Sequence, residues 1–294
     1  MCYLMSMSHI ILDGRVVREA RLPALKEFFG GLAKPPVMTI IQVGDRPDST
    51  AFIRAKSTFA AKVGVTVRHI HLPESITQAE LLSVIAENNK ASDVHGIIVQ
   101  LPLPLSLDQE TVIEAIDPTK DADGLSAANV KRWLSGHPAA LYPATTRGVR
   151  ELLSHYRIDI FGRKVAIVGR SMLVGKPLAA WALNENATVI VCHSKTPDLA
   201  AETKQADIVI VAAGRPGLVS AKHLKSGAVV VDVGINTVQG QKLEEEVGRR
   251  LVGDVDFDSA STVASAISPV PGGVGPMTVL ALFENLADLI RKAY

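Results

Sequence analysis

Apolar and polar positions alternate in blocks along the first half of the chain. The runs VMTIIQVG from residue 37, VTVRHIHLP from residue 65 and VHGIIVQLP from residue 94 are typical of buried strands. Between them, STAFIRAKSTFAAKVG and TQAELLSVIAENN carry apolar residues at helical spacing. Continuous apolar strands separated by helices indicate parallel strands covered on both faces, so this half is predicted to be an α/β domain.

A second series of apolar runs follows the loop HPAALYPATTRG. Four strands are predicted in KVAIVG, TVIVCHS, DIVIVAAG and AVVVDVGIN, with a helix starting near Gly175. In this order they predict a second doubly wound, Rossmann-type sheet. The boundary is placed near Tyr142, which gives a first domain over residues 1–141 and a second over residues 142–275. An amphipathic helix over residues 276–294 is expected to join the first domain.

Composition and charge narrow the classes of protein. The 294 residues are 47% hydrophobic and 21% charged, which is ordinary for a globular chain. A net charge of +1 provides no field that would gather nucleic acid or an acidic membrane surface, so neither is expected as a partner. Only Cys2 and Cys192 are present, which predicts a reducing, cytoplasmic setting without disulfides.

The opening MCYLMSMSHI has no Lys or Arg ahead of its short apolar residues, which argues against a secretory signal. These residues are expected to form a disordered extension before HIILDG. No apolar run approaches the ~20 residues that a membrane helix needs.

Lys56 stands out on the helix predicted in STAFIRAKSTFAAKVG. Phe52, Lys56, Phe59 and Val63 recur at steps of four, three and four, so the lysine is predicted to lie inside an apolar stripe. The aliphatic part of such a lysine either packs on the apolar surface while its ammonium group reaches water, or its amine takes part in catalysis.

Two polar residues are candidates for the same domain's ligand edge. Gln100 ends an apolar run, and the LPLP after it cannot extend a strand, so Gln100 is placed at a carboxyl strand end, where open α/β sheets bind ligands. KDADG, residues 120–124, is either an Asx turn or a segment that offers Asp123 to a heterocycle with N–H donors.

The second domain contains a candidate nucleotide site. Gly169 ends the strand KVAIVG and Gly175 starts a helix, which suits a pyrophosphate at the helix amino end, although a simple tight turn has the same spacing. The next strand ends in Cys-His-Ser-Lys, without the acidic residue that holds the ribose of NAD. Ser194, Lys195 and Arg170 suit a 2'-phosphate, so NADP is favoured over NAD, the alternative being solvated loop charges.

The remaining patterns carry less chemistry. The histidines show no ligand spacing with Cys or carboxylates, so no metal is predicted. The glycine-rich stretch PGGVGPMT is either a hinge or backbone that lies flat against a planar ring.

Several long segments together resemble the bifunctional methylenetetrahydrofolate dehydrogenase/cyclohydrolase (FolD) family. They are VGDRPDSTAFIRAK, GIIVQLPLP, KDADG, GRSMLVGKP, VDVGIN, VGDVDF and PVPGGVGPMT, in the family's order, from about residue 11 to the last helix. The resemblance implies two α/β domains with a cleft between them, a homodimer in the cytoplasm, and a place in one-carbon metabolism and purine biosynthesis. It implies oxidation of 5,10-methylenetetrahydrofolate by NADP, followed by hydrolysis of the methenyl product to 10-formyltetrahydrofolate.

The resemblance also assigns residues. Lys56 is the catalytic amine, Gln100 orients it and Asp123 holds the pterin. On the folate side it implies Phe52, Pro271, Gly272 and Gly275. On the cofactor side it implies contacts at Thr145, Gly169, Arg170, Ser171, Ser194, Gly214, Ile235 and Thr278.

The sequence departs from the family at two places. Relatives usually have tyrosine where this chain has Phe52, and a phenyl ring can stack on the folate but cannot hydrogen-bond. A dehydrogenase with weakened cyclohydrolase is therefore an alternative to the bifunctional enzyme. In PATTRG, Ala144 and Thr146 stand where relatives commonly have cysteine and a second proline, with no lost chemical group of consequence.

Two further classes share parts of this pattern. An NADP-dependent dehydrogenase of amino or hydroxy acids has the same two-domain plan, and an NADP-sensing binding protein would bind the cofactor without turnover. Neither explains why Lys56, Gln100 and Asp123 occur together.

Overall fold

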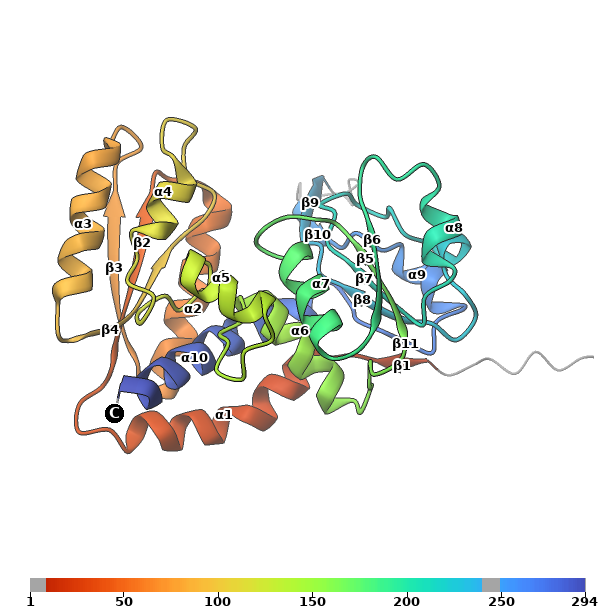
Figure 1. The fold of residues 1–294 in the computed structure, drawn as a ribbon, viewed down its shortest axis with the longest axis horizontal. Coiled ribbons are helices and arrows are strands. Elements are labelled where there is room, and N and C mark those ends of the chain that lie inside the picture. Colours follow the sequence, from red (N-terminus) through yellow and green to blue (C-terminus); the bar gives the residue numbers. More distant parts are fainter. Residues whose placement is uncertain (1–8, 240–248, 294) are drawn as a thin grey trace, which may run out of the picture. The chain divides into compact units, whose positions relative to one another are not determined.

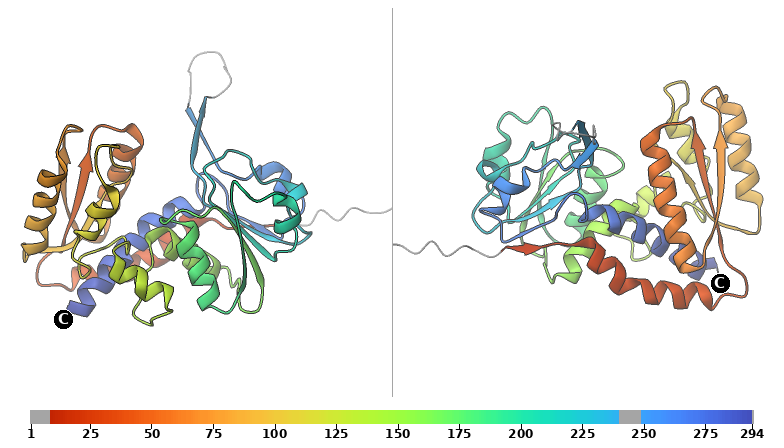
Figure 2. Two further views of the ribbon diagram at one scale, coloured as in Figure 1. Left: turned by 45° about the horizontal axis from the view of Figure 1, so that its top comes forward. Right: turned by 180° about the vertical axis from the view of Figure 1, so that it is seen from behind.

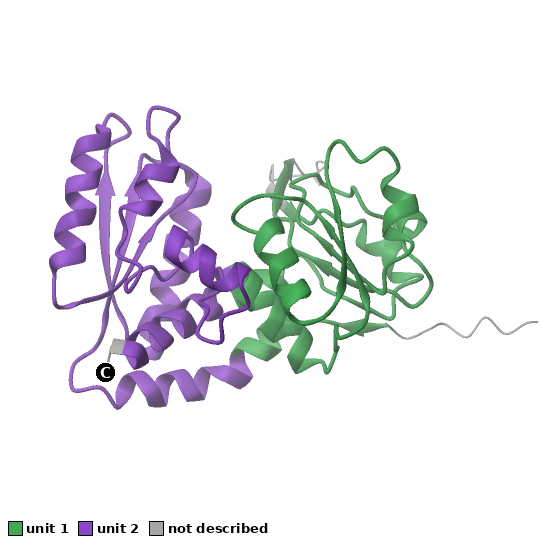
Figure 3. Ribbon diagram, in the orientation of Figure 1, with its two compact units in different colours: residues 1–18, 145–278 green, residues 19–144, 279–294 purple. Residues whose placement is uncertain are grey.

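The computed structural model describes residues 9–239 and 249–293. Cys2 and the extension expected at the start of the chain lie outside the described residues. The chain forms two compact units (Figure 3): one combines residues up to 18 with 145–278, and the other combines 19–144 with 279–294. The sequence assigned everything before Tyr142 to the first domain, whereas residues 9–18 group with the second series of strands because β1 (Ile10–Ile11) pairs with β11 (Ala266–Ile267).

The unit of residues 19–144 and 279–294 contains a three-stranded parallel sheet in the order β3-β2-β4. Its strands are β2 (Val37–Val43), β3 (Thr66–Leu72) and β4 (Val94–Val99), and helices alternate with them along the chain (Figure 1). This confirms the α/β fold predicted for this half. Helix α1 (Gly14–Gly30) belongs to this unit from residue 19 onward, and α10 (Val274–Ala293) from residue 279 onward. The other helices of the unit are α2 (Pro47–Val63), α3 (Gln78–Lys90), α4 (Gln109–Glu114) and α5 (Ala127–Leu134).

Helices cover both faces of this sheet. Ile97 and Val99 pack with Leu81 and Ile85 of α3 in one apolar cluster. On the other face Gly96 lies so close to α10 that an added Cβ would be 2.8 Å from Leu286 Cδ1. A larger residue at position 96 would therefore displace the Leu286 side chain of α10.

Local signals in the sequence explain where the helices begin and end. Thr77 and Glu80 form a reciprocal capping box at the start of α3, with Glu80 N donating to Thr77 Oγ1 at 3.3 Å and Thr77 N donating to Glu80 Oε2 at 2.8 Å. Helix α2 starts at Pro47 and ends at Gly64, whose φ of 80° suits glycine.

The last helix is less amphipathic than the sequence suggested. Almost every side chain between Leu280 and Ile290 is buried, including the polar Glu284 and Asn285. A helix that is buried on nearly all sides acts as a core element rather than a surface helix.

The other unit contains a six-stranded parallel sheet in the order β1-β11-β8-β7-β5-β6. Four of its strands match the four predicted ones, whereas β1 and β11 have two residues each and were not predicted. Because β6 and β7 lie on opposite sides of β5, the strand order reverses at the carboxyl end of β5, which is where such sheets bind ligands. The four predicted strands are β5 (Lys164–Val168), β6 (Thr188–Cys192), β7 (Ile208–Val211) and β8 (Val229–Asp232).

Short elements complete this unit. An antiparallel hairpin of β9 (Asn236–Gln239) and β10 (Arg249–Val252) extends away from the main sheet (Figure 2, blue). Val168, Val211 and Val230 of the sheet pack with Leu224 and Ala260 in one core cluster. The helices are α6 (Ala144–His155), α7 (Gly175–Asn184), α8 (Leu199–Thr203), η1 (Ala221–His223) and α9 (Phe257–Ser261).

Candidate active site

Lys56 lies at the point where helix α2 changes from a buried to an open environment. Phe59 and Val63 are 4% and 2% exposed, and the Phe59 ring packs against Phe283 of α10 with centroids 5.2 Å apart. Phe52, one turn on the other side of the lysine, is 42% exposed. The predicted apolar stripe is therefore buried only over its second half, and Phe52 lies on its exposed half.

The Lys56 ammonium group has a defined partner. Its Nζ donates a hydrogen bond of 3.0 Å to Gln100 Oε1, and the side chain is half-buried. Burial lowers the pKa of Lys56, and the nearby negative charge of Asp123 acts against that shift. An amine with a lowered pKa is more often neutral near pH 7, as a proton acceptor must be.

Gln100 is oriented by both its backbone and its side chain. It directly follows β4, and its N–H donates to Ile41 O at 2.8 Å, which continues the pairing with β2. Its Nε2 donates to Leu101 O at 2.8 Å, which directs Oε1 to the lysine. The structure thus brings Gln100 and Lys56 together, as the family resemblance implied, and places Gln100 at the end of β4, as the sequence predicted.

Asp123 reaches the same place because KDADG runs alongside β4. Ile97 bridges Asp121 in parallel register, and Ile97 N donates to Lys120 O at 2.7 Å. The chain turns directly after this bridge, with Gly124 N donating to Asp121 O at 3.3 Å, and Asp123 in that turn lies near enough to Lys56 for their charges to interact. Burial raises the pKa of Asp123, while Lys56 opposes the shift and Asp121 adds to it.

The Asx-turn interpretation of KDADG describes its other aspartate. The buried Asp121 carboxylate accepts hydrogen bonds from Gly124 N at 2.9 Å, Ser126 N at 2.8 Å and Asn129 Nδ2 at 2.9 Å. Asp121 therefore shapes the loop, and Asp123 is left to interact with Lys56. The turn interpretation thus applies to Asp121, and the binding of a heterocycle by Asp123 stays a prediction.

Two anchors of this segment were not recognised in the sequence. Lys120 Nζ donates to the carbonyls of Asn89 and Ala91, each at 2.7 Å, at the end of α3. Asn285 of α10, which is fully buried, donates from Nδ2 to Ala122 O at 2.9 Å and to Tyr142 O at 3.0 Å. Both anchors join segments far apart in the sequence, so no local pattern reveals them.

The predicted nucleotide turn in the other unit is sterically restricted to glycine. Gly169 has a φ of 128°, and an added Cβ would lie 2.1 Å from Ala212 O. A Cβ on Gly175 would lie 2.3 Å from Gly169 O, so the start of α7 sits directly on the turn. Ser171 Oγ accepts a hydrogen bond of 3.2 Å from Val174 N. This tight strand–turn–helix at the switch point fits a pyrophosphate at the amino end of α7.

The residues after β6 fit a phosphorylated ribose. Ser194, Lys195 and Arg170 are exposed, and the strand end carries no carboxylate. His193 shapes the turn, because its Nδ1 accepts from Lys195 N at 3.1 Å and its N–H donates to Thr196 Oγ1 at 2.9 Å. The donor set is cationic and polar, which suits a 2'-phosphate better than a 2'-hydroxyl.

Four of the predicted site residues line one hollow of about 330 Å³. They are Ile235, Pro271, Gly272 and Gly275. Thr145 at the start of α6 and Thr278 on α10 are not among its lining residues. Gly214, in the turn after β7, has a φ of 64° and donates its N–H to Asp254 Oδ2 at 2.8 Å.

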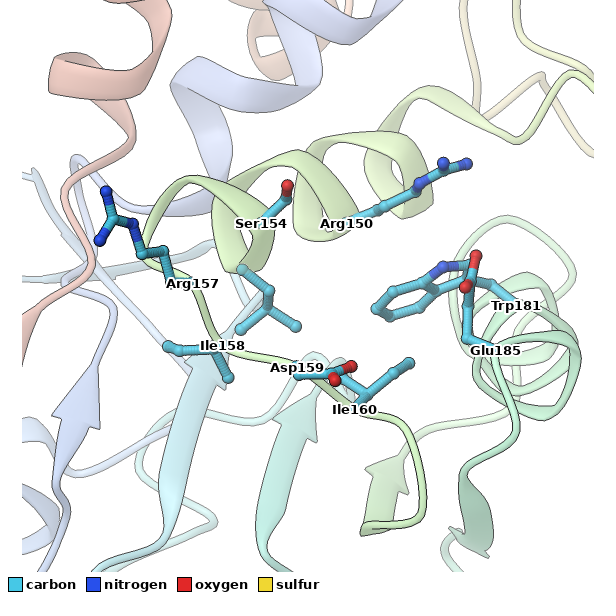
Figure 4. Close-up of a pocket in the computed structure, with 9 residues that line it drawn as sticks. Arg150, Ser154, Arg157, Ile158, Asp159, Ile160, Trp181 and Glu185 are labelled. Atoms are coloured by element: carbon cyan, nitrogen blue, oxygen red, sulfur yellow. The ribbon is translucent and has the colours of Figure 1, made fainter.

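A second hollow of about 380 Å³ lies at the far end of α7 (Figure 4). Arg150 and Arg157 share its lining with Asp159 and Glu185, and the buried Trp181 Nε1 has no hydrogen-bond partner among the described residues. Opposite charges are equally represented there, so the lining selects no ligand class.

Within residues 9–239 and 249–293, no group of three or more His, Cys, Asp or Glu side chains is arranged to hold a metal ion. Over the same residues, no helix is both long and apolar enough to cross a membrane.

Comparison with known proteins covers almost the whole chain. Residues 12–123 match the tetrahydrofolate dehydrogenase/cyclohydrolase catalytic domain, and residues 143–294 match the NAD(P)-binding domain of the same family. The bifunctional protein FolD of Exiguobacterium sibiricum is 44% identical over 96% of this chain and 99% of its own. That of Methanospirillum hungatei is 45% identical over 96% and 98%.

Solved structures agree with this match. The bifunctional enzyme FolD of Campylobacter jejuni has a TM-score of 0.91 and 40% identity, covering 98% of this chain and 100% of its own. The Trypanosoma brucei FolD, solved with NADP and an inhibitor, has a TM-score of 0.91 and 38% identity over 97% and 98%. A shikimate dehydrogenase of Thermus thermophilus, at 13% identity and a TM-score of 0.53, shares the fold alone. The chain therefore belongs to the tetrahydrofolate dehydrogenase/cyclohydrolase family.

Proposed function

We propose that this chain oxidises 5,10-methylenetetrahydrofolate with NADP and hydrolyses the methenyl product to 10-formyltetrahydrofolate. The observation that carries the proposal is the half-buried Lys56 amine, held 3.0 Å from Gln100 within the segment that matches the family's catalytic domain. Lys56, Gln100 and Asp123 would act on the folate, and the unit with the glycine turn would bind the cofactor.

Ring opening needs a group that takes a proton from water. As the neutral amine, Lys56 would accept one proton from the water that attacks the methenyl carbon, while the second water proton passes to the ring nitrogen as its bond to that carbon breaks. Gln100 would keep the amine in place, and Asp123 would bind N–H donors of the pterin. The lowered pKa of Lys56 supports this role, because the neutral amine is then available nearer pH 7.

The oxidation half depends on how the chain holds NADP, which supplies the hydride acceptor. Gly169 and Gly175 fit a close approach of backbone to the pyrophosphate, and Ser171 lies in the same turn. Arg170, Ser194 and Lys195 would bind the 2'-phosphate. The Trypanosoma brucei relative, whose structure contains NADP, supports the same cofactor here.

The phenylalanine at position 52 is not a sufficient reason to expect a dehydrogenase with weakened cyclohydrolase activity. The relatives compared are bifunctional, and in this chain the partner of Lys56 is Gln100, which needs no hydroxyl at position 52. We therefore expect Phe52→Tyr to change ring opening by less than about tenfold, against the ~10² to 10⁴ that a positioned proton transfer contributes. A gain of a hundredfold or more in the methenyltetrahydrofolate hydrolysis assay would mean that the phenyl ring limits the enzyme.

The other classes are not favoured. A dehydrogenase of amino or hydroxy acids would share the fold, as the shikimate dehydrogenase does at 13% identity, but not the near full-length match to the folate family. A binding protein without turnover gives no reason for Lys56, Gln100 and Asp123 to converge.

We further propose that the enzyme is a cytoplasmic homodimer that supplies one-carbon units for purine biosynthesis. These points rest on the family resemblance, and the net charge of +1 supports small molecules rather than nucleic acid or membranes as partners. Light scattering coupled to size exclusion would give twice the chain mass of 31.3 kDa for a dimer.

Incubation of the purified chain with methylenetetrahydrofolate and NADP tests the proposed function. Formation of NADPH together with 10-formyltetrahydrofolate supports it, and absence of both products contradicts it. Replacing NADP by NAD in the same assay tests the cofactor assignment.

A further inference from the structure

We propose that Asp254 is a positioning residue that holds together the two loops carrying Gly214 and Ile235, and that Asp232 holds Asp254 in place. The inference rests on the proposed function, which assigns both loops to NADP. The sequence pointed to Gly214 and Ile235 but not to either aspartate.

The Asp254 carboxylate organises the turn that follows β7. It is fully buried, and its Oδ2 accepts hydrogen bonds from Ala213 N at 2.6 Å and Gly214 N at 2.8 Å. Its Oδ1 accepts from Arg215 N at 2.8 Å. Three successive backbone N–H groups therefore converge on one carboxylate, and each bond is charge-assisted.

The same carboxylate holds the loop that follows β8. Asn236 Nδ2 donates to Asp254 Oδ1 at 2.8 Å, and Asn236 is the residue after Ile235. Gly234 lies against the carboxylate so closely that an added Cβ would be 2.2 Å from Asp254 Cγ. One side chain thus fixes residues 213–215 and residues 234–236 relative to each other.

Asp232 supports Asp254 from the end of β8. Its Oδ1 accepts from Asp254 N at 3.0 Å and Gly234 N at 2.9 Å, and its Oδ2 accepts from Val255 N at 2.9 Å. Asp232 itself is 3% exposed, and Ser268 Oγ accepts from its N–H at 2.7 Å. Burial raises the pKa of Asp232 to about 6, partly offset by these backbone donors.

Because of this arrangement, the 213–215 turn would contact the cofactor through its backbone shape and not through free N–H groups. Successive N–H groups in such a turn form a concavity that binds anions, including phosphates. Here Asp254 supplies the anion from within the chain, so the three amides are not free for cofactor phosphate. Gly214 would contact NADP through its shape, and that shape depends on Asp254.

Asp254→Asn is the direct test because it keeps the size of the side chain. The amide has one acceptor oxygen, and its NH₂ group would face backbone donors. Because loops that have lost these bonds would have to be ordered when the cofactor binds, we expect the Kd for NADPH, measured by fluorescence, to rise about tenfold to a hundredfold. Methenyltetrahydrofolate hydrolysis without NADP should stay within about threefold of wild type, since it does not require the cofactor loops.

Two further variants make the test selective. Asn236→Ala removes only the link to the second loop and should raise the NADPH Kd by about threefold to tenfold. Asp256→Asn is the matched control: this carboxylate, two residues away, is exposed and accepts from Ser259 N at 3.2 Å at the start of α9. The control should bind NADPH like wild type.

Two results would overturn the inference. One is an unchanged NADPH Kd in both Asp254→Asn and Asn236→Ala. The other is an equal loss of hydrolysis and NADPH binding in both variants, which would show a general structural role. If wild type binds NADPH but does not turn over folate, the proposed function fails, while the Kd comparison still decides the role of Asp254.

Discussion

Replacing Gln100 by glutamate places a negative charge where the Lys56 amine now meets a neutral oxygen. The atoms are 3.0 Å apart. At that distance, two unit charges attract by about 1.4 kcal/mol in a water-like dielectric and by more at the lower dielectric of a protein surface. The added carboxylate favours the ammonium form, so the pKa of Lys56 is expected to rise.

This rise would remove the neutral amine on which ring opening depends. An attraction of about 1.4 kcal/mol lowers the neutral fraction of the Lys56 amine about tenfold. Hydrolysis at pH 7 should therefore fall by at least about tenfold in Gln100→Glu. The assay is the loss of methenyltetrahydrofolate across a pH series, with the spontaneous rate measured in parallel and subtracted. The rate of the variant should recover toward alkaline pH.

Gln100→Met is the matched control because it removes the acceptor without adding charge. It should lower the rate without moving the midpoint of the pH profile to higher pH. If Gln100→Glu and wild type have the same midpoint, Lys56 does not act as the neutral amine, and the reasoning from its lowered pKa is refuted.

Three further changes test other parts of the account. Lys56→Met should lower the rate of ring opening ~10²- to 10⁴-fold while the Kd for NADPH stays at the wild-type value. Equal hydrolysis rates in the variant and the wild type would show that Lys56 takes no part in the mechanism. Asn285→Ala leaves the carbonyls of Ala122 and Tyr142 without this donor, which costs about 1 to 3 kcal/mol each. The free energy of unfolding, measured with denaturant, should therefore fall by at least about 2 kcal/mol, and a wild-type value would contradict this reasoning. Arg170→Ala should reduce the preference for NADP over NAD in the ratio of kcat/KM values, and an unchanged ratio would mean that the 2'-phosphate is held elsewhere.

The strands were predictable from the sequence wherever an apolar run was long enough to be recognised. Four strands of the six-stranded sheet and all three of the β3-β2-β4 sheet were found in this way, whereas their order in the sheets was not predicted. β1 and β11 were missed because two residues, Ile10–Ile11 or Ala266–Ile267, are too few to show a period. Their pairing also moved residues 9–18 out of the first domain.

The candidate site was predictable where a residue ends a strand or sits on a helix. Gln100 and Lys56 were located from such positions, and the pair is in contact. Phe52 was misjudged because helical spacing places it on the face of Lys56 but does not tell where burial ends. Asn285 and Asp254 were missed because their partners are 18 to 163 residues away in the sequence.

The most direct test of the central claim is a paired assay on one preparation. NADPH formation from methylenetetrahydrofolate reports the oxidation, and loss of methenyltetrahydrofolate above its spontaneous rate reports ring opening. The account predicts that both activities are present, and that Lys56→Met removes the second while wild-type binding of NADPH remains. Robust oxidation with ring opening at the spontaneous rate in the wild-type chain would contradict it.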